Sequence, residues 1–322
     1  MEPKVWRLHM RPKGQKSPKG EKKKTPEESA RYALDGPQPF IGIGWELNEP
    51  GKDVSKEEAI ELAKKLTRAP VRRFIEEVRV GDLVWVRRKS ESHAWYYGLY
   101  KIIGDYQYRG DEDSFRYDFH HVRSVLPIKE KEFVAGPVAN SFLAPSTLIH
   151  IGSSTSRDAA RCYTWHVCNE ARIFDGCESL RSSCDRVLRE SDAGPLTLLG
   201  PVELEDVVAL YLQMEYGYHL VPGTHHSSTY GYEYDLVKRG EEGLVKARVQ
   251  VKTNQKIAPK DYAGSGYTWY LFTLSPNTRE LDTADGVVLL DPGELAKFVQ
   301  ANEDLMPSPI VELLDVYRAI SG

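Results

Sequence analysis

The sequence contains no apolar run that approaches the length of a membrane-spanning helix. Such a helix needs roughly 18 to 20 consecutive apolar residues. The N-terminus carries charge, but no apolar segment follows it, so a secretory signal peptide is not expected. We therefore expect a cytoplasmic protein that has no membrane partner.

Cysteine is scarce, and the four cysteines all lie between residues 162 and 184. No two of them have the spacing of about two to four residues that is typical of a zinc knuckle. Buried, reduced thiols are the simpler expectation, because cysteine packs as a small apolar residue.

A large excess of charge of either sign is also absent, since the formal net charge is −4. The net charge of the chain therefore does not by itself indicate a nucleic-acid partner. Basic residues are clustered locally instead, most clearly in the run 11–24, which is rich in Lys, Pro and Gly. Such a run cannot bury a core. It is expected to be a solvated loop, and the alternative is an arm that contacts phosphates.

What the chain does have is enough length and apolar content for two folded domains. It contains 322 residues, of which 41% are hydrophobic and 28% are charged. A chain of this length exceeds one ordinary domain. We expect one domain over 1–135, a linker and helical connector over 136–197, and a second domain over 198–322.

The pattern of residues 1–135 indicates a small β-barrel with one or two helices. A helix is predicted over 55–68, where apolar residues recur at helical spacing and Ser55 with Glu58 forms a capping box. Strands are predicted from alternating or β-branched and aromatic runs. These runs are 5–10, 40–45, 80–88, 94–104 and 119–126.

Four short motifs follow one another in this region. They are Gly-Ile-Gly-Trp at 42–45, Val-Gly-Asp-Leu-Val-Trp at 80–85, Tyr-Tyr-Gly-Leu-Tyr-Lys-Ile at 96–102 and His-Val-Arg-Ser-Val at 121–125. Their order, with the helix between the first two, resembles the PUA-like superfamily and specifically its EVE and YTH-type branch. Members are β-pseudobarrels that take a modified base into an aromatic pocket. The resemblance therefore implies a modified-base reader over 1–135.

The aromatic residues of this region are the candidates for that pocket, because aromatic faces stack on extruded bases. Core packing is the alternative for each of them. Trp45, which follows the glycine pair, is the best single candidate for a pocket wall. The full candidate set is Trp45, Trp85, Trp95, Tyr96 and Tyr97.

The second domain is organised around a predicted β-hairpin. Its strands are the runs 231–235 and 246–252, and a polar turn over 238–243 joins them. Gln250 and Lys252 are two residues apart and share one face of their strand. Asp235 is expected to meet them across the hairpin. A carboxylate, an amide oxygen and an ammonium that converge in this way can hold a divalent metal and orient a water molecule.

A helix predicted over 202–216, which ends at Gly217, precedes the hairpin. Glu205 lies close to its apolar stripe, and a carboxylate in that position needs a partner. A metal ion or the lysine of the hairpin would supply one.

The order Glu205, Gly217-Tyr218, Tyr234-Asp235, then Gln250-Val251-Lys252 resembles the Mrr-like branch of the PD-(D/E)xK nuclease superfamily. The resemblance covers about residues 198–300. Family members usually carry Asp-Gly-Gly-Ile-Asp before the first strand, whereas this chain has Tyr-Gly-Tyr-Glu-Tyr-Asp over 230–235. Glu233 and Asp235 could share a face, so which of the two faces the metal stays open.

The resemblance and the chemistry of the side chains assign catalytic roles to four residues. Asp235 would coordinate Mg²⁺, for which Mn²⁺ can substitute, and Gln250 would donate an amide oxygen. Lys252 would position or deprotonate the attacking water and stabilise the charge on the phosphate. Glu205 would hold a metal-bound water, so the metal set is Asp235, Gln250 and Glu205.

The expected architecture is α+β and α/β: a PUA-like β-pseudobarrel followed by a restriction-endonuclease-like mixed-sheet α/β core. The expected function is that of a modification-dependent DNA endonuclease of the type IV-like restriction class, acting in antiphage defence. It would act on double-stranded DNA that carries a modified base, as a homodimer, because cutting both strands needs two active sites. The alternatives are a non-cleaving binder of modified nucleic acid with a degenerate nuclease fold, and an RNA-directed reader-nuclease. Methylcytosine, hydroxymethylcytosine, its glucosylated form and methyladenine all stay open as the modification.

Overall fold

The structure is a computed structural model. It describes residues 2–10, 24–45, 47, 54–65, 69–89, 95–151, 155–173, 177–189, 191, 193–224, 231–241, 243–253, 255–275 and 284–322. The chain divides into two compact units. Unit 1 comprises 1–134, 138–153 and 160–182, and unit 2 comprises 135–137, 154–159 and 183–322. None of the described helices is both long and apolar enough to span a membrane. The predicted loop or arm over 11–24 lies outside the described residues, apart from Lys24.

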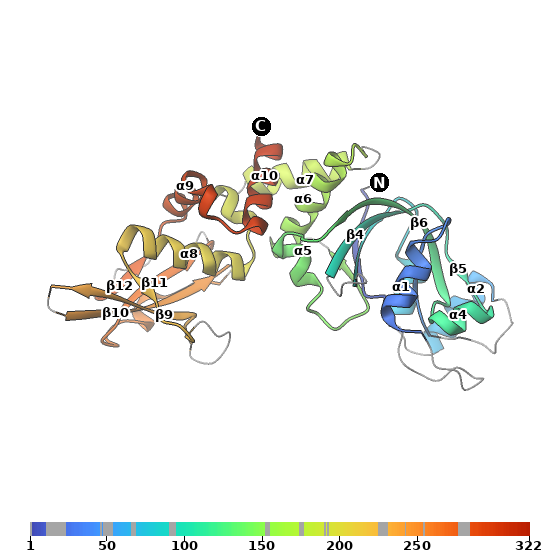
Figure 1. The fold of residues 1–322 in the computed structure, drawn as a ribbon, viewed down its shortest axis with the longest axis horizontal. Coiled ribbons are helices and arrows are strands. Elements are labelled where there is room, and N and C mark those ends of the chain that lie inside the picture. Colours follow the sequence, from blue (N-terminus) through green and yellow to red (C-terminus); the bar gives the residue numbers. More distant parts are fainter. Residues whose placement is uncertain are drawn as a thin grey trace. The chain divides into compact units, whose positions relative to one another are not determined.

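Unit 1 is built on a mixed, mostly antiparallel sheet (Figure 1). The strand order is β2-β6-β4-β3-β1-β7, and β5 pairs with β6. β1 runs parallel to β3, while the other pairs are antiparallel. The strands are β1 (Val5–Leu8), β2 (Phe40–Ile43), β3 (Leu83–Lys89), β4 (Trp95–Ile102), β5 (Gln107–Tyr108), β6 (His121–Lys131) and β7 (Leu148–Ile151). All five strands predicted in residues 1–135 are confirmed, with ends that differ by a few residues.

Helices pack on this sheet and close its core. The predicted helix over 55–68 is confirmed as α2 (Lys56–Lys65), and Ser55 Oγ accepts the Glu58 N–H at 3.2 Å. Its predicted last turn, 66–68, lies outside the described residues. Three further helices were not predicted: α1 (Pro26–Leu34), α3 (Ala69–Glu76) and α4 (Glu112–Tyr117).

The segment 136–197 is more structured than a linker. It contains α5 (Gly136–Ser141), β7, α6 (Thr155–Glu170), α7 (Glu178–Arg189) and the short 3₁₀ helix η1 (Gly194–Leu198). Strand β7 and most of α6 belong to unit 1, whereas η1 belongs to unit 2. All four cysteines are buried, which confirms that they are packed inside the protein.

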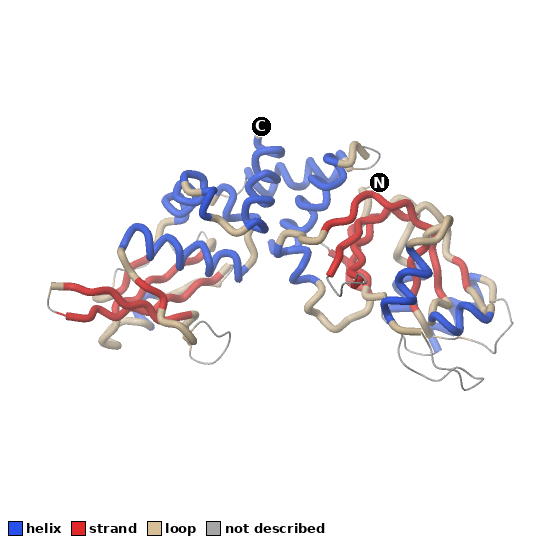
Figure 2. Tube along the Cα trace, in the orientation of Figure 1, coloured by secondary structure: helices blue, strands red, loops and turns tan. Residues whose placement is uncertain are grey.

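Unit 2 contains a five-stranded mixed sheet in the order β12-β11-β10-β9-β8. β8 and β9 pair antiparallel, as do β9 and β10, while β10, β11 and β12 run parallel. Helix α8 lies along the sheet (Figures 1 and 2). The elements are α8 (Pro201–Tyr216), β8 (His219–Leu220), β9 (Tyr234–Gly240), β10 (Gly243–Lys252), η2 (Pro259–Asp261), β11 (Thr268–Thr273), β12 (Val287–Leu289), α9 (Pro292–Ala301), η4 (Glu303–Leu305) and α10 (Ser308–Ser321).

The sequence accounts for the boundaries of α8. Pro201 occupies the first turn, where its missing N–H is not needed. Gly217 ends the helix with φ of 69°, a left-handed conformation that glycine adopts without strain. Leu204, Val208 and Leu212 are buried, as the predicted apolar stripe requires. The mixed α+β fold class predicted from the sequence is confirmed.

Candidate active site and aromatic residues

The register of the β9–β10 hairpin decides which side chains meet in unit 2. Tyr234 pairs with Val249, and Asp235 pairs with Arg248. The Glu233 N–H continues the ladder by donating to the Val249 carbonyl at 2.8 Å. Since the strands run antiparallel, Glu233 falls opposite Gln250.

Glu233 is the carboxylate that contacts the predicted catalytic pair. Gln250 Nε2 donates to Glu233 Oε1, and Lys252 Nζ donates to the same oxygen at 3.3 Å. Gln250 is buried, with 3% of its surface exposed. Lys252 is half-exposed and Glu233 mostly buried. An amide and an ammonium therefore hold one carboxylate in place, with the ammonium still within reach of solvent.

Glu205 approaches this cluster from α8. Burial, together with the negative charges of Glu233 and Asp206, raises the pKa of Glu205 to about 7, while the positive charge of Lys252 acts in the opposite direction. Tyr234 contributes to this placement, because its hydroxyl donates to the Glu205 carbonyl at 3.1 Å and links β9 to α8. The two carboxylates thus lie close enough to repel each other, as carboxylates that share a cation commonly do.

The expectation that Asp235 faces Gln250 and Lys252 across the hairpin is not met. Asp235 lies two residue pairs further along, where Arg248 Nε donates to its Oδ1 at 3.2 Å. The Tyr232 hydroxyl donates to Oδ2 at 3.3 Å, and the Asp235 N–H donates to Thr224 Oγ1 at 3.1 Å. The reason is the strand register, which places Glu233 rather than Asp235 opposite Gln250.

The donor set around Glu233 fits a divalent cation that prefers oxygen. It offers the carboxylates of Glu233 and Glu205 and the amide oxygen of Gln250, which are ligand types that Mg²⁺ binds. Among the residues that the structure describes, no three His, Cys, Asp or Glu side chains form a group that could hold a metal by themselves. A metal here would therefore combine two carboxylates with the amide.

In unit 1, Trp45 is held in a strained backbone conformation. Its φ is 73°, in the left-handed region that a bulky residue seldom adopts. His121 Nε2 lies 2.9 Å from the Trp45 carbonyl, and His121 Nδ1 lies 2.9 Å from the Tyr106 hydroxyl. Burial lowers the pKa of His121 to about 3, so the ring is neutral. The carbonyl can only accept, so Nε2 carries the proton and Nδ1 accepts from Tyr106.

The other four aromatic candidates have different surroundings. Trp85 is fully buried, stacks on Tyr163 of α6 and donates through Nε1 to Thr164 Oγ1 at 2.9 Å. Trp95 is 41% exposed, with Arg87 lying 4.3 Å from its ring centroid. The remaining two are Tyr96, whose hydroxyl donates to Glu132 Oε1 at 2.9 Å, and Tyr97, whose ring packs edge-on against Phe142. The described contacts do not gather the five residues into one cluster.

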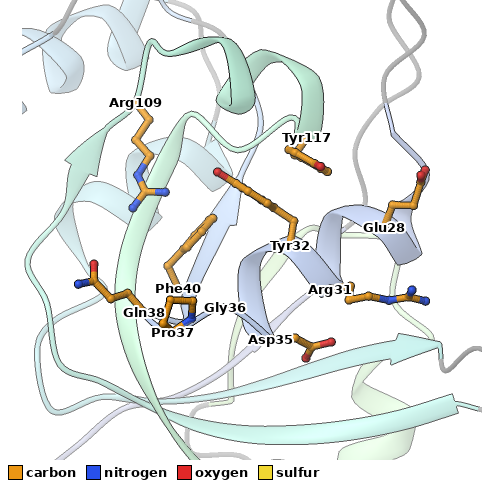
Figure 3. Close-up of a pocket in the computed structure, with 10 residues that line it drawn as sticks. All are labelled: Glu28, Arg31, Tyr32, Asp35, Gly36, Pro37, Gln38, Phe40, Arg109 and Tyr117. Carbon is orange, nitrogen blue, oxygen red and sulfur yellow. The ribbon is translucent and has the colours of Figure 1, made fainter.

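A pocket that the sequence analysis missed lies beside α1 and β2 (Figure 3). Its volume is about 670 Å³. Tyr32 stacks on Tyr117 with ring centroids 4.0 Å apart, and Arg109 lies 4.4 Å from the Phe40 ring centroid. None of the five aromatic candidates lines it. Its residues come from separate stretches of the chain, and no sequence motif marks them. The lining residues are Glu28, Arg31, Tyr32, Asp35, Gly36, Pro37, Gln38, Phe40, Arg109 and Tyr117.

Sequence comparison finds no protein-family model that matches this chain, and no curated protein that matches it. Among solved structures, the chain is similar to the MspJI restriction endonuclease in complex with a 27-mer oligonucleotide. The match covers 87% of this chain and 73% of that chain, with 13% sequence identity and a TM-score of 0.25. So low a TM-score supports no conclusion about fold or function, which rest on the geometry of the molecule itself.

Proposed function

We propose that this protein is a Mg²⁺-dependent DNA endonuclease whose hydrolytic site lies in unit 2. The observation that supports it is that Gln250 and Lys252 both donate to one carboxylate oxygen of Glu233, with Glu205 beside them. Carboxylates, an amide and an ammonium at one half-exposed point are the groups that phosphodiester hydrolysis needs.

The residues divide the work according to their chemistry. Glu233, Glu205 and the Gln250 amide oxygen would hold Mg²⁺, which when bound supplies positive charge to the phosphate oxygens. Lys252 would orient the attacking water and stabilise the negative charge that develops on the phosphate. Asp235, which the sequence pattern assigned to the metal, has Arg248 as its neighbour in this arrangement.

We further propose that cleavage depends on a modified base that unit 1 binds. The resemblance of residues 1–135 to the PUA-like superfamily and the strained, half-buried Trp45 support this assignment. Cutting both strands would require two copies of the site, so the active form would be a homodimer on double-stranded DNA.

Incubation of the purified chain with modified and unmodified plasmid DNA in Mg²⁺ tests the proposal. We expect cleavage of modified plasmid, little cleavage of unmodified plasmid, and none after chelation of the metal. Lys252→Ala should lower the cleavage rate by about 100-fold or more while DNA binding persists. Lys297→Ala removes an exposed lysine that pairs with Glu294 on α9, and is the matched control. Undiminished cleavage by Lys252→Ala would show that the site lies elsewhere, and equal cleavage of both plasmids would exclude modification dependence.

A further inference from the structure

One face of β10 carries polar side chains in a continuous row. Alternate residues of a strand point to the same side, so Lys246, Arg248, Gln250 and Lys252 share a face. Lys246 is exposed, Arg248 is 25% exposed, and Gln250 and Lys252 belong to the Glu233 cluster. The row thus leads away from the proposed hydrolytic site through two basic side chains.

Arg248 is fixed in this row by aromatic rings and a carboxylate. Its Cζ lies 3.8 Å from the ring centroid of Tyr267 and 4.4 Å from that of Tyr232. Its Nε donates to Asp235 Oδ1 at 3.2 Å. The two rings confine the guanidinium through cation–π contacts, and the hydrogen bond to Asp235 fixes the position of Nε.

This arrangement leaves the guanidinium with donors to offer. In the part of the chain that the structure describes, the hydrogen bond of Arg248 uses Nε, so the two terminal nitrogens can bind a ligand. An arginine already held in one conformation loses little side-chain entropy when it binds. Guanidinium groups fit phosphate oxygens in a paired geometry.

The spacing of the row suits a polyanion rather than a single ion. Residues two apart on a strand are separated by about 7 Å. Successive phosphates of a nucleic-acid strand repeat on the same order of distance. If a phosphate occupies the site at Gln250 and Lys252, its neighbours along the strand fall near Arg248 and Lys246.

We infer that Arg248, held by Tyr267, Tyr232 and Asp235, together with Lys246, is a binding site for phosphodiester groups that flank the one being hydrolysed. The inference rests on the proposed function for the position of the hydrolysed group. It assigns Asp235 as the residue that positions Arg248.

Fluorescence anisotropy of a short labelled duplex tests the inference, with the full chain in Ca²⁺ to support binding without turnover. The duplex is unmodified, because backbone contacts do not depend on base identity. We expect Arg248→Ala to weaken binding about tenfold and to reduce the slope of log affinity against log salt by about 0.9, the value for one lost phosphate contact. Lys246→Ala, at an exposed position that should not affect folding, is expected to reduce the slope by a similar amount. Arg248→Lys should keep the slope, since it keeps the charge, and Lys297→Ala should change neither quantity.

The outcomes separate this inference from the proposed function. Wild-type affinity and slope in both Arg248→Ala and Lys246→Ala would overturn the inference, even if Mg²⁺-dependent cleavage is observed. Absence of duplex binding by the wild-type chain would overturn it as well. Reduced affinity and slope in the variants of a chain that binds DNA but does not hydrolyse it would support the inference and contradict the proposed function.

Discussion

Three of the four polar candidates of unit 2, Gln250, Lys252 and Glu205, gather around one carboxylate, whereas the aromatic candidates of unit 1 do not gather. Gln250 and Lys252 reach the same oxygen of Glu233. Trp85, in contrast, faces α6, while Trp95 is 41% exposed. The difference indicates that a site built on two adjacent strands depends on residues that lie close together in the sequence. A pocket wall depends on what covers each face of the sheet, and that covering comes from distant parts of the chain.

The strongest way to break this comparison is to truncate the two tryptophans. Trp85→Ala should lower the free energy of unfolding by about 3–5 kcal/mol, because it leaves a cavity against α6 and removes the hydrogen bond from Trp85 Nε1 to Thr164 Oγ1. Trp95→Ala should change it by less than about 1 kcal/mol, because the side chain is 41% exposed. Urea denaturation of both variants measures the difference. Equal losses would mean that the two rings do not differ in burial as described.

A smaller effect should follow from the buried imidazole that supports Trp45. Burial lowers the pKa of His121 to about 3 in the folded protein, below its ordinary value of 6.5. Between these two pKa values the unfolded chain binds a proton that the folded chain does not. The contribution of neutral His121 to the free energy of unfolding is therefore fully present above pH 6.5, and it is lost progressively as the pH drops from 6.5 towards 3. The loss should be about 1.4 kcal/mol per pH unit within that window.

His121→Gln tests this, because the amide can still donate to the Trp45 carbonyl but does not titrate. We expect its stability to fall less steeply than that of the wild type between pH 6.5 and 5, when both are followed by urea denaturation. His219→Gln, at an exposed position, should retain the steeper wild-type dependence. A wild-type slope in His121→Gln would place the pH dependence in other groups.

Much of unit 2 could be predicted because its signals are local. The boundaries of α8 follow from Pro201 and Gly217, and the existence of the hairpin follows from two runs around a polar turn. The first strand was placed too early, at 231–235, whereas β9 is Tyr234–Gly240 and includes part of the predicted turn. The approach of Gln250 and Lys252 to a carboxylate follows from their spacing. The identity of that carboxylate did not follow, because it depends on the register. A turn placed over 238–243 leaves the pairing undetermined, whereas the strands pair as far as Gly240 with Gly243.

Unit 1 shows what the sequence could not supply. Its strands were predicted from their apolar patterns, yet the environment of each aromatic ring depends on long-range contacts. The partners of Trp85 are Tyr163 and Thr164, nearly 80 residues further along the chain. Arg248 was missed for another reason: its basic character within the alternating row of β10 was visible, but its aromatic neighbours Tyr232 and Tyr267 lie just before β9 and just before β11.

The most direct test of the proposed site compares Glu233→Gln with Asp235→Asn. Each variant removes one negative charge, and the two positions are two residues apart in the sequence. The measurement is single-turnover cleavage of modified duplex DNA in Mg²⁺ at saturating protein. We predict that Glu233→Gln lowers the cleavage rate by about 100-fold or more, whereas Asp235→Asn cleaves at close to the wild-type rate once DNA is saturated. Loss of cleavage in Asp235→Asn with retention in Glu233→Gln would contradict the account, and would place Asp235 at the reacting phosphate.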